Sequence, residues 1–298
     1  MKYLYYPGCS LEGTAIEYNL STRSLMQALD VELIEIDNWT CCGASAAEAT
    51  SRLLSLALPA RVLALAEAMG EPIDILVPCS ACYLNLKKVE QGVKKDPDLL
   101  ARLNEILSVD DLTLKGSLRV RHLLDVMSQD LGAAAIAPRV LRRLEGFRIA
   151  PYYGCQCLRP YAVFDDPEAP TSMEPLIRST GADVHPWHMA GRCCGAAHMN
   201  TKTEVALELV NAILTDARGA DAIVTVCPMC QMNLEAYQRK IAKTYAEEAF
   251  EQTILYLPQL LGWAMGLSEQ DLRIDLNLAV SDAFRTKLHQ TEETRRAG

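Results

Sequence analysis

Short apolar runs alternate with longer amphipathic segments along most of the chain. Apolar runs of about four to eight residues, bounded by turn-forming residues, are typical of strands buried in a parallel sheet. This pattern predicts strands at 2–6, 31–36 and 73–78 in the first half, and at 147–153, 182–187 and 221–226 in the second. Helical patterns fill the segments between them, so strands and helices alternate.

Residues 201–218 carry the clearest helical pattern. Apolar side chains at the helical spacing share one face of this segment: Val205, Leu209, Val210, Ile213 and Leu214. Thr201 and Glu204 have the spacing of a capping box, which predicts the start of the helix. Gly219 predicts its end, because glycine readily adopts the left-handed conformation that follows a helix.

The alternation of strands and helices indicates the fold class. Elements in this order form α/β folds whose strands are largely parallel. We therefore predict a first α/β domain at 1–145, ending in a helical linker of roughly 96–145, and a second α/β domain at 146–298. The second domain ends in a helix and a polar tail from Ser268 onwards, which we interpret as a frayed end or a docking strap.

The second half of the chain repeats the motifs of the first. Three motifs recur in the same order: YLYYPGC (3–9) and APYYGC (150–155), WTCCGA (39–44) and GRCCGAA (191–197), VPCSACYLNL (77–86) and VCPMCQMNL (226–234). Asn85 and Asn233 follow their Cys-x-x-Cys pairs at the same distance. A duplication that keeps this order twice indicates two equivalent sites.

Ten of the eleven cysteines belong to this repeat: Cys9, Cys41, Cys42, Cys79 and Cys82, then Cys155, Cys193, Cys194, Cys227 and Cys230. In the predicted fold the motifs follow the carboxyl ends of strands, which meet at one edge of a parallel sheet. We therefore expect the five cysteines of each half to converge. Cys157 lies outside the pattern, with Leu11 at its counterpart position, and we interpret it as a bystander near the second site.

Composition and charge narrow the class of protein. The chain has 298 residues, 50% hydrophobic and 22% charged, a balance typical of globular domains. Its formal net charge of −9 argues against a nucleic-acid surface, which needs clustered lysine and arginine. We find no secretion signal and no apolar stretch long enough for a membrane span, so we predict a cytoplasmic protein. In that compartment, cysteines are more often metal or redox ligands than disulfides.

Five thiolates at one site are one more than a structural zinc ion or a cubane iron–sulfur cluster takes. An adjacent pair such as Cys41 and Cys42 suits a cluster in which neighbouring thiolates contact different irons, or bracket the same one. Gly43 and Gly195 let the backbone approach a bulky inorganic group, and amides there can hydrogen-bond to sulfides. Zinc and buried structural thiols are the alternatives, and zinc in place of the cluster of the first half stays open.

These motifs resemble the CCG cysteine-rich domain, present twice as in the catalytic B subunit of heterodisulfide reductase and its bacterial relatives. The turns CCGASAAE and CCGAAH carry the resemblance, each between an upstream Gly-Cys and a downstream Cys-x-x-Cys. The resemblance implies two Rossmann-like domains, each with a noncubane [4Fe-4S] cluster held by the five patterned cysteines of its half. It also implies a reaction in which the two clusters cleave or form a disulfide by one-electron steps.

The resemblance also implies partners. The chain has no Cys-x2-Cys-x2-Cys-x3-Cys-Pro run of the ferredoxin type, so we expect its electrons to come from a separate subunit. In the heterodisulfide reductase family these partners are a small ferredoxin-like C subunit and a flavoprotein A subunit, and the substrate is a small-molecule or carrier-bound disulfide. Two other functions stay open: an electron-relay iron–sulfur subunit without its own substrate, and a zinc-stabilised interaction module.

Three histidines, His185, His188 and His198, bracket the second vicinal pair. An imidazole near neutral pKa can protonate a departing thiolate, and we single out His188 for this catalytic role. The alternative for each of them is an ordinary hydrogen-bonded histidine.

Charged and aromatic residues also lie beside the motifs. Arg159 and Arg192 either balance thiolate charge or bind an anionic group of the substrate. Trp39 and Trp187 precede the vicinal pairs, and we interpret them as packing that excludes water. Lys87 and Lys88 are interpreted as a solvated helix face.

Overall fold

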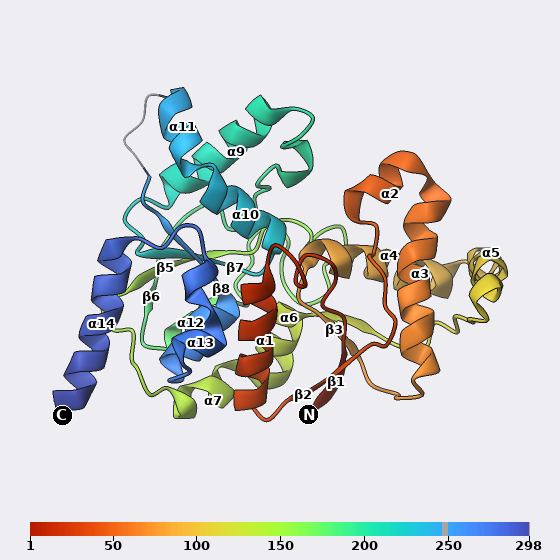
Figure 1. Ribbon diagram of the computed structural model, residues 1–298, viewed down its shortest axis with the longest axis horizontal. Helices are drawn as coiled ribbons and strands as arrows, with labels where there is room; N and C mark the ends of the chain where they lie inside the picture. The colour runs from red at the N-terminus through yellow and green to blue at the C-terminus, as the bar shows by residue number, and fades with distance from the viewer. Residues whose placement is uncertain (246–249, 298) are drawn as a thin grey trace. The chain divides into compact units, whose positions relative to one another are not determined.

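The computed structural model describes residues 1–245 and 250–297. Contacts within the chain divide it into two units. The first consists of Met1–Ile16 and Met26–Val126, and the second of Glu17–Leu25 and Met127–Gly298. The division therefore runs through helix α1 (Ile16–Ala28). Each unit contains one sheet of four strands (Figure 1). The domain boundary at 145/146 stays a prediction.

The sheet of the first unit has the strand order β2-β1-β3-β4, and all its neighbours are parallel. Its strands are β1 (Lys2–Tyr5), β2 (Glu32–Glu35), β3 (Ile75–Val77) and β4 (Val120–His122). The inner strand β3 is wholly apolar and wholly buried, as expected for a parallel sheet. Besides α1, which follows β1, the helices that follow its strands are α2 (Ala44–Thr50), α3 (Arg52–Ala68), α4 (Ser80–Lys95), α5 (Pro97–Leu107), η1 (Ser108–Asp110) and α6 (Leu123–Asp125).

The sheet of the second unit has the order β6-β5-β7-β8, again parallel throughout. Its strands are β5 (Arg148–Tyr152), β6 (Asp183–Val184), β7 (Ala222–Thr225) and β8 (Thr253–Tyr256). The other elements from residue 126 onwards are η2 (Val126–Leu131), α7 (Gly132–Ile136), η3 (Ala137–Arg139), α8 (Glu174–Ser179), η4 (Ala196–His198), α9 (Thr203–Asp216), α10 (Pro228–Ala236), α11 (Gln238–Tyr245), α12 (Leu257–Ala264), α13 (Glu269–Leu272), η5 (Ile274–Leu276) and α14 (Asp282–Ala297).

The two sheets have the same topology. In each, the first strand along the chain is central and the second lies at one edge, while the third and fourth extend the sheet on the other side. This confirms the predicted fold class, two duplicated α/β domains with parallel strands. All six predicted strands occur, although β6 is only two residues long.

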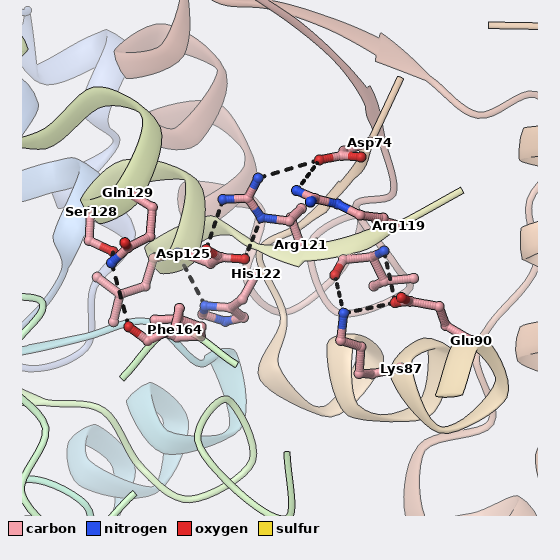
Figure 2. Close-up of polar contacts among 12 residues, drawn as sticks. Asp74, Lys87, Glu90, Arg119, Arg121, His122, Asp125, Ser128, Gln129 and Phe164 are labelled. Carbon is pink, nitrogen blue, oxygen red and sulfur yellow. Dashed lines mark hydrogen bonds and ion pairs between the residues drawn. The ribbon is translucent and has the colours of Figure 1, made fainter. Parts of the chain in front are cut away.

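The sequence pattern missed the fourth strand of each sheet. β4 lies inside the segment predicted as a helical linker, which is therefore only partly helical. It contains Arg121 and leads directly into α6, so no apolar run marks it. Arg121 is buried, and two carboxylates compensate its charge. Its guanidinium donates to Asp125 Oδ1 over 2.8 Å and to Asp74 Oδ2 over 3.3 Å (Figure 2). A charged residue in a strand thus hid the strand from the hydrophobic pattern.

Helix α9 begins two residues later than predicted. Its N-cap is Lys202, which makes no side-chain capping bond, so the predicted capping box of Thr201 and Glu204 is wrong. The apolar face is also rotated, because Val205 is 38% exposed while Leu207 is buried. Gly219 has a φ of +90° and follows the end of the helix, in agreement with its predicted role.

The polar tail contains α13, η5 and α14, so much of it is helical as far as Ala297 rather than a frayed end, and Gly298 lies outside the described residues. The ring of Phe284 in α14 packs edge-on against Phe147, with centroids 5.5 Å apart. The Lys287 ammonium lies 2.8 Å from Asp221 Oδ1. These contacts attach α14 to the residues just before β5 and β7, and thus to the second unit.

Candidate functional site

The cysteines of each unit lie in loops beyond the carboxyl ends of the strands. Cys9 follows β1, the vicinal pair lies in the loop after β2, and Cys79 is the N-cap of α4 after β3. The second unit repeats this arrangement around β5, β6 and β7. We call these groups the first site (Cys9, Cys41, Cys42, Cys79 and Cys82) and the second site (Cys155, Cys193, Cys194, Cys227 and Cys230).

The thiols of the first site form a chain of contacts. The Sγ atoms of Cys9 and Cys41 are 3.4 Å apart, and those of Cys42 and Cys82 are 3.3 Å apart. Cys41 also hydrogen-bonds to Cys42, and Cys79 to Cys82. The structure therefore brings together all five residues that the sequence singled out in this half.

The second site gathers its thiols in two groups. Cys155 hydrogen-bonds to Cys193, while Cys230 hydrogen-bonds to both Cys194 and Cys227, with Sγ atoms of the Cys194–Cys230 pair 3.5 Å apart. The charges of Cys194 and Cys227 act on Cys155, so the two groups are neighbours. The ten cysteines of the repeat thus form two clusters of five thiols each.

The extra cysteine makes a different kind of contact. The buried Cys157 thiol donates to the backbone carbonyl of Tyr153 over 3.2 Å. This bond attaches it to the chain just before Cys155. Its predicted role as a bystander stays a prediction.

Glycines allow the close approach of chain and sulfur. Gly43 and Gly195 have φ of +82° and +70°, and their amides donate to the Sγ of Cys41 and Cys193 over 3.4 and 3.3 Å. The sequence did not reveal the part played by two further glycines, Gly8 and Gly154. A Cβ on them would lie 2.8 Å from Cys82 Sγ and 3.0 Å from Cys230 Sγ, respectively, closer than these atoms can come without a shift.

The repeated asparagines hold the vicinal pairs in place. Asn85 in α4 donates to the carbonyls of Cys42 and Ala44 over 3.3 and 3.2 Å, and Asn233 in α10 donates to the carbonyl of Cys194 over 3.1 Å. Both amides are buried. Each helix that carries a Cys-x-x-Cys pair therefore also positions the Cys-Cys-Gly turn of its own unit.

Buried tyrosines, which sequence reasoning passed over, support the same turns. The hydroxyls of Tyr6 and Tyr152 each donate over 2.7 Å to the carbonyl of the residue just before the vicinal pair. The rings of Trp39 and Trp187 pack edge-on against them at centroid distances of 5.4 and 5.9 Å. The tryptophans thus pack beside the sites, and the tyrosines are detectable as the aromatic residues before both Gly-Cys motifs.

Hydrogen bonds between the thiols decide which of them are acidic. Bonds from Cys41 and Cys82 lower the pKa of the Cys42 thiol to about 3, and a bond from Cys155 lowers the pKa of the Cys193 thiol to about 6. The same bonds raise the pKa of Cys41 and of Cys155. Thiolates crowded this closely repel one another, so a cationic group is needed to hold all of them deprotonated.

The surroundings of the first site are acidic. A hollow of about 600 Å³ opens beside Cys41, and its lining includes the carboxylates of Glu12, Glu35 and Asp37. Trp39 also lines it and donates through Nε1 to Glu35 over 3.0 Å. Negative charge therefore lies beside Cys41, one of the two exposed cysteines of this site.

The surroundings of the second site include positive charge. The hydrogen bond from Cys155 lowers the pKa of Cys193 most, and the amide of Gly195 also lowers it. The charges of His198 and Arg159 make smaller contributions in the same direction. The Arg159 guanidinium is held by Glu168 at 2.9 Å and by the carbonyl of Gly191. Of the two arginines that the sequence singled out, Arg159 thus acts electrostatically on a site thiol.

The three histidines have different environments. The buried His185 places Nε2 3.3 Å from the carbonyl of Asp216. The His188 side chain is 93% exposed, with Nδ1 4.0 Å from Asp216 Oδ1. His198, in η4, is the histidine whose charge acts on Cys193. A catalytic role of His188 stays a prediction.

The donor set of each site suits a sulfur-rich metal group. Clustered thiolates favour zinc, copper(I) and iron–sulfur clusters, and backbone amides directed at sulfur are typical of cluster sites. In the described part of the chain, no three Cys, His, Asp or Glu side chains are arranged to hold a single metal ion.

Comparison with known families identifies the repeat. The CCG cysteine-rich domain matches the chain twice, at residues 3–87 and 149–235. The two matched segments cover more than half of the chain and contain all ten patterned cysteines.

Relatives match along nearly the whole chain. The 8-methylmenaquinol:fumarate reductase membrane anchor subunit of Wolinella succinogenes is 32% identical over 281 residues, 93% of this chain and 96% of the relative. The B subunit of the ferredoxin/F420H2-dependent CoB-CoM heterodisulfide reductase of Methanosarcina acetivorans is 28% identical over 294 residues, 96% of each chain. A heterodisulfide reductase B-subunit-like protein of Archaeoglobus profundus is 27% identical over 279 residues, 91% of this chain and 92% of the relative.

A solved structure supports the fold alone. The crystal structure of a hypothetical protein from Helicobacter pylori superposes with a TM-score of 0.77 at 15% identity. The match covers 95% of this chain but 52% of that one, so this chain spans about half its length. Within the described residues, no helix has both the length and the apolarity to cross a membrane.

Proposed function

Because the chain belongs to the CCG cysteine-rich domain family and carries that domain twice, we propose that it is the disulfide-converting subunit of a heterodisulfide-reductase-like complex. Its relatives are subunits of multi-subunit reductases, and the chain is an iron–sulfur redox subunit of this kind. We further propose one noncubane [4Fe-4S] cluster at each site, with the five cysteines of the site as ligands.

The observation that carries the proposal is the double convergence of five thiols. The sites share their supporting contacts as well as their cysteines: an amide on the first thiol of the vicinal pair, an asparagine on the carbonyl of the second, and a tyrosine on the preceding carbonyl. These bonds hold the Cys-Cys-Gly turn of each site in the same arrangement. Rigid support of this kind favours a fixed ligand geometry.

When bound, the two clusters supply single electrons. Two electrons and two protons convert one disulfide into two thiols, and the reverse reaction forms the disulfide and releases them. The chain's own residues supply positive charge and protons near the reacting sulfur. We propose His188 as the proton donor, with His198 as its rival because the charge of His198 acts on Cys193. Loss of about 100-fold in turnover on replacing one of them with glutamine would identify the donor.

We also propose that the electrons reach this chain from other subunits. The family resemblance implies a ferredoxin-like C subunit and a flavoprotein A subunit as these partners, and relatives named as subunits of reductases support a multi-subunit complex. This is consistent with the absence of a ferredoxin-type cysteine run from the sequence.

One observation favours a second candidate. The relative at 32% identity is a subunit of an 8-methylmenaquinol:fumarate reductase, whose name describes electron transfer from a quinol to fumarate. The second candidate is therefore an electron relay with no disulfide substrate, which the name of this similar chain favours. The two candidates share their clusters and differ in whether a disulfide is consumed.

The first experiment tests the clusters. Anaerobically purified protein should contain iron and sulfide in amounts that fit two clusters, whereas about two zinc ions and no sulfide would reject the proposal. The variant Cys194→Ser should lose the cluster of the second site and keep most of the first. Cys157→Ser is the matched control, a buried cysteine outside the pattern, and should keep both. Equal loss from both sites in Cys194→Ser would show that the sites are not independent.

The second experiment separates the two candidates. The reduced protein is mixed with a small disulfide that carries acidic groups, and separately with a menaquinone analogue. Disulfide conversion predicts two thiols per two electrons, with no thiol released by Cys194→Ser. Oxidation by the quinone alone, without thiol release from any disulfide, would favour the relay.

A further inference from the structure

The helices that carry the two Cys-x-x-Cys pairs differ at one buried repeat position. Lys87 follows Cys82 by five residues in α4, and Glu235 follows Cys230 by five residues in α10. Lys87 is 4% exposed and Glu235 is 9% exposed. Five residues advance a helix by about 7.5 Å, so each ionisable group lies on the order of 10 Å from its site.

In the first unit the position is a closed ion pair. The Lys87 ammonium lies 2.8 Å from Glu90 Oε2 and 2.9 Å from the carbonyl of Val120 in β4 (Figure 2). Glu90 also binds Lys94 at 2.8 Å and the Val120 amide at 3.0 Å. Burial raises the pKa of Glu90, but the bonds from both lysines outweigh it, so the pKa is lowered. The Glu90 carboxylate therefore stays ionised at neutral pH.

In the second unit the same position holds an acid with neutral partners. Glu235 Oε1 accepts from Gln231 Nε2 at 2.9 Å and from the amides of Leu278 and Ala279 at 3.1 and 3.4 Å. Burial raises the pKa of Glu235 to about 7, and the charge of Glu17 adds to the effect. The group is thus balanced between its two protonation states near neutral pH.

The neighbours of Glu235 connect it to the second site and to solvent. Gln231 directly follows Cys230 in α10 and donates to the carboxylate. Tyr256, at the end of β8, feels the charges of Glu17, Glu235 and Cys227. On the other side, Leu278 is 74% exposed, so the bonded amide brings the carboxyl close to the surface.

We propose that Glu235 takes up a proton when the second site is reduced and releases it when the site is oxidised. The inference rests on the proposed function, in which a one-electron donor subunit reduces the site. For each electron that enters the site, Glu235 takes up at most about half a proton from solvent, because its proton affinity changes by only about tenfold. At about 10 Å and an effective dielectric constant near 20, a unit charge changes the proton affinity of a buried carboxylate by about tenfold.

A redox titration of the whole protein at several pH values tests this inference. If reduction raises the proton affinity of Glu235 tenfold, protonation of Glu235 favours reduction of the site tenfold. The midpoint potential of the second site should therefore fall by about 59 mV as pH rises through 7, because 59 mV corresponds to a factor of ten for one electron. Glu235→Gln should abolish this step. Glu204→Gln, the same change at an exposed position of the same unit, should retain it. The first site, with its closed ion pair, should not show the step that Glu235→Gln removes.

Infrared difference spectra provide a second readout that needs no variant. Reduction of the wild-type protein near pH 7.5 should produce the carbonyl band of a newly protonated carboxylic acid. Absence of that band, or a potential step that survives in Glu235→Gln, would overturn the inference while leaving the proposed function intact. Absence of iron and sulfide would instead reject the proposed function itself.

Discussion

The vicinal pair of the first site borders a hollow lined by carboxylates, whereas the vicinal pair of the second site lies near Arg159 and His198. Yet the same hydrogen bonds shape both Cys-Cys-Gly turns. In each, an asparagine amide and a tyrosine hydroxyl donate to equivalent backbone carbonyls. The duplicated parts are those that a five-thiol site needs for its geometry. The charges around them have diverged, so the two sites have different electrostatic surroundings.

The buried charges have diverged as well. The first unit neutralises Lys87 with Glu90, and the second places Glu235 and Gln238 at the corresponding positions. Gln238 takes over the contact to the chain entering the fourth strand, because it donates to the carbonyl of Gln252 and accepts from its amide. One unit therefore closes the edge of its sheet with an ion pair, and the other with amides and a neutralisable acid.

The largest effect on stability is expected from opening the ion pair. Lys87→Met leaves Glu90 buried with only Lys94 as its cation, and removing one partner of a buried pair costs about 3 kcal/mol of unfolding free energy. Lys88→Met removes a half-buried lysine from the same helix, whose ammonium lies 3.2 Å from Glu48, and should cost less than about 1 kcal/mol. Urea unfolding measures both. Equal costs would show that the buried pair does not stabilise the first unit.

Glu235 in the second unit should make the unfolding free energy depend on pH in the opposite direction to Glu90 in the first unit. The pKa of Glu235 is raised from 4.5 to about 7 in the folded state, so between these values the folded chain binds more protons than the unfolded chain. The Glu235 contribution to unfolding free energy therefore falls as pH rises through this window, by roughly 3 kcal/mol. Glu90, whose pKa is lowered, instead loses its contribution as pH falls.

Glu235→Gln isolates this contribution. The unfolding free energy of the variant relative to wild type should increase from about pH 4.5 to about pH 7 and then stay level. Urea titrations at several pH values measure the difference, with Glu204→Gln as the exposed control. A difference independent of pH would mean that Glu235 titrates alike in both states.

The sequence was sufficient for the parts of the molecule that repeat. Cysteine spacing together with strand–helix alternation predicts which thiols meet, because parallel strands end at one edge of a sheet. Cys9 and Cys41, far apart in sequence, are in contact for this reason. The predicted capping box of Thr201 and Glu204 is wrong because the spacing of residue types alone does not determine at which residue the backbone becomes helical. In the structure the N-cap is Lys202.

The parts that could not be predicted depend on tertiary partners. Lys87 was interpreted as part of a solvated helix face, which is wrong, because it is buried against β4. The strand itself was missed, since Arg121 interrupts its apolar pattern, and without the strand nothing indicated a partner for the lysine. Gly8 and Gly154 likewise look like ordinary turn residues until the sulfur of a distant cysteine lies against them.

Those glycines provide a smaller test of whether the two sites are built alike. Gly154→Ala adds a Cβ 3.0 Å from Cys230 Sγ at a φ of +68°, and should cost about 2 kcal/mol and lower the iron content of the second site. Gly146→Ala has a similar φ of +79° with no atom within 4 Å, and should cost about 1 kcal/mol with full iron content. Gly8→Ala should repeat the effect at the first site. Iron loss in Gly146→Ala would assign it to backbone strain alone.

The smallest effect should come from the charges outside the sites. In metal-free protein, the exposed Cys41 and Cys193 can be alkylated by neutral iodoacetamide or by anionic iodoacetate. Both reagents attack the thiolate, so the ratio of their rates removes the difference in pKa and reports the local potential. Iodoacetate should be disfavoured at Cys41 relative to Cys193 by severalfold at low ionic strength, and salt should reduce the difference. Peptide mass spectrometry measures each rate.

Charge-removing variants provide the control. Glu35→Gln together with Asp37→Asn should raise the ratio of the iodoacetate rate to the iodoacetamide rate at Cys41. Glu105→Gln removes an exposed acid outside the hollow and should leave this ratio unchanged. Identical ratios at the two cysteines would show that the diverged charges do not reach the thiols, and that the two sites present the same surface to a partner.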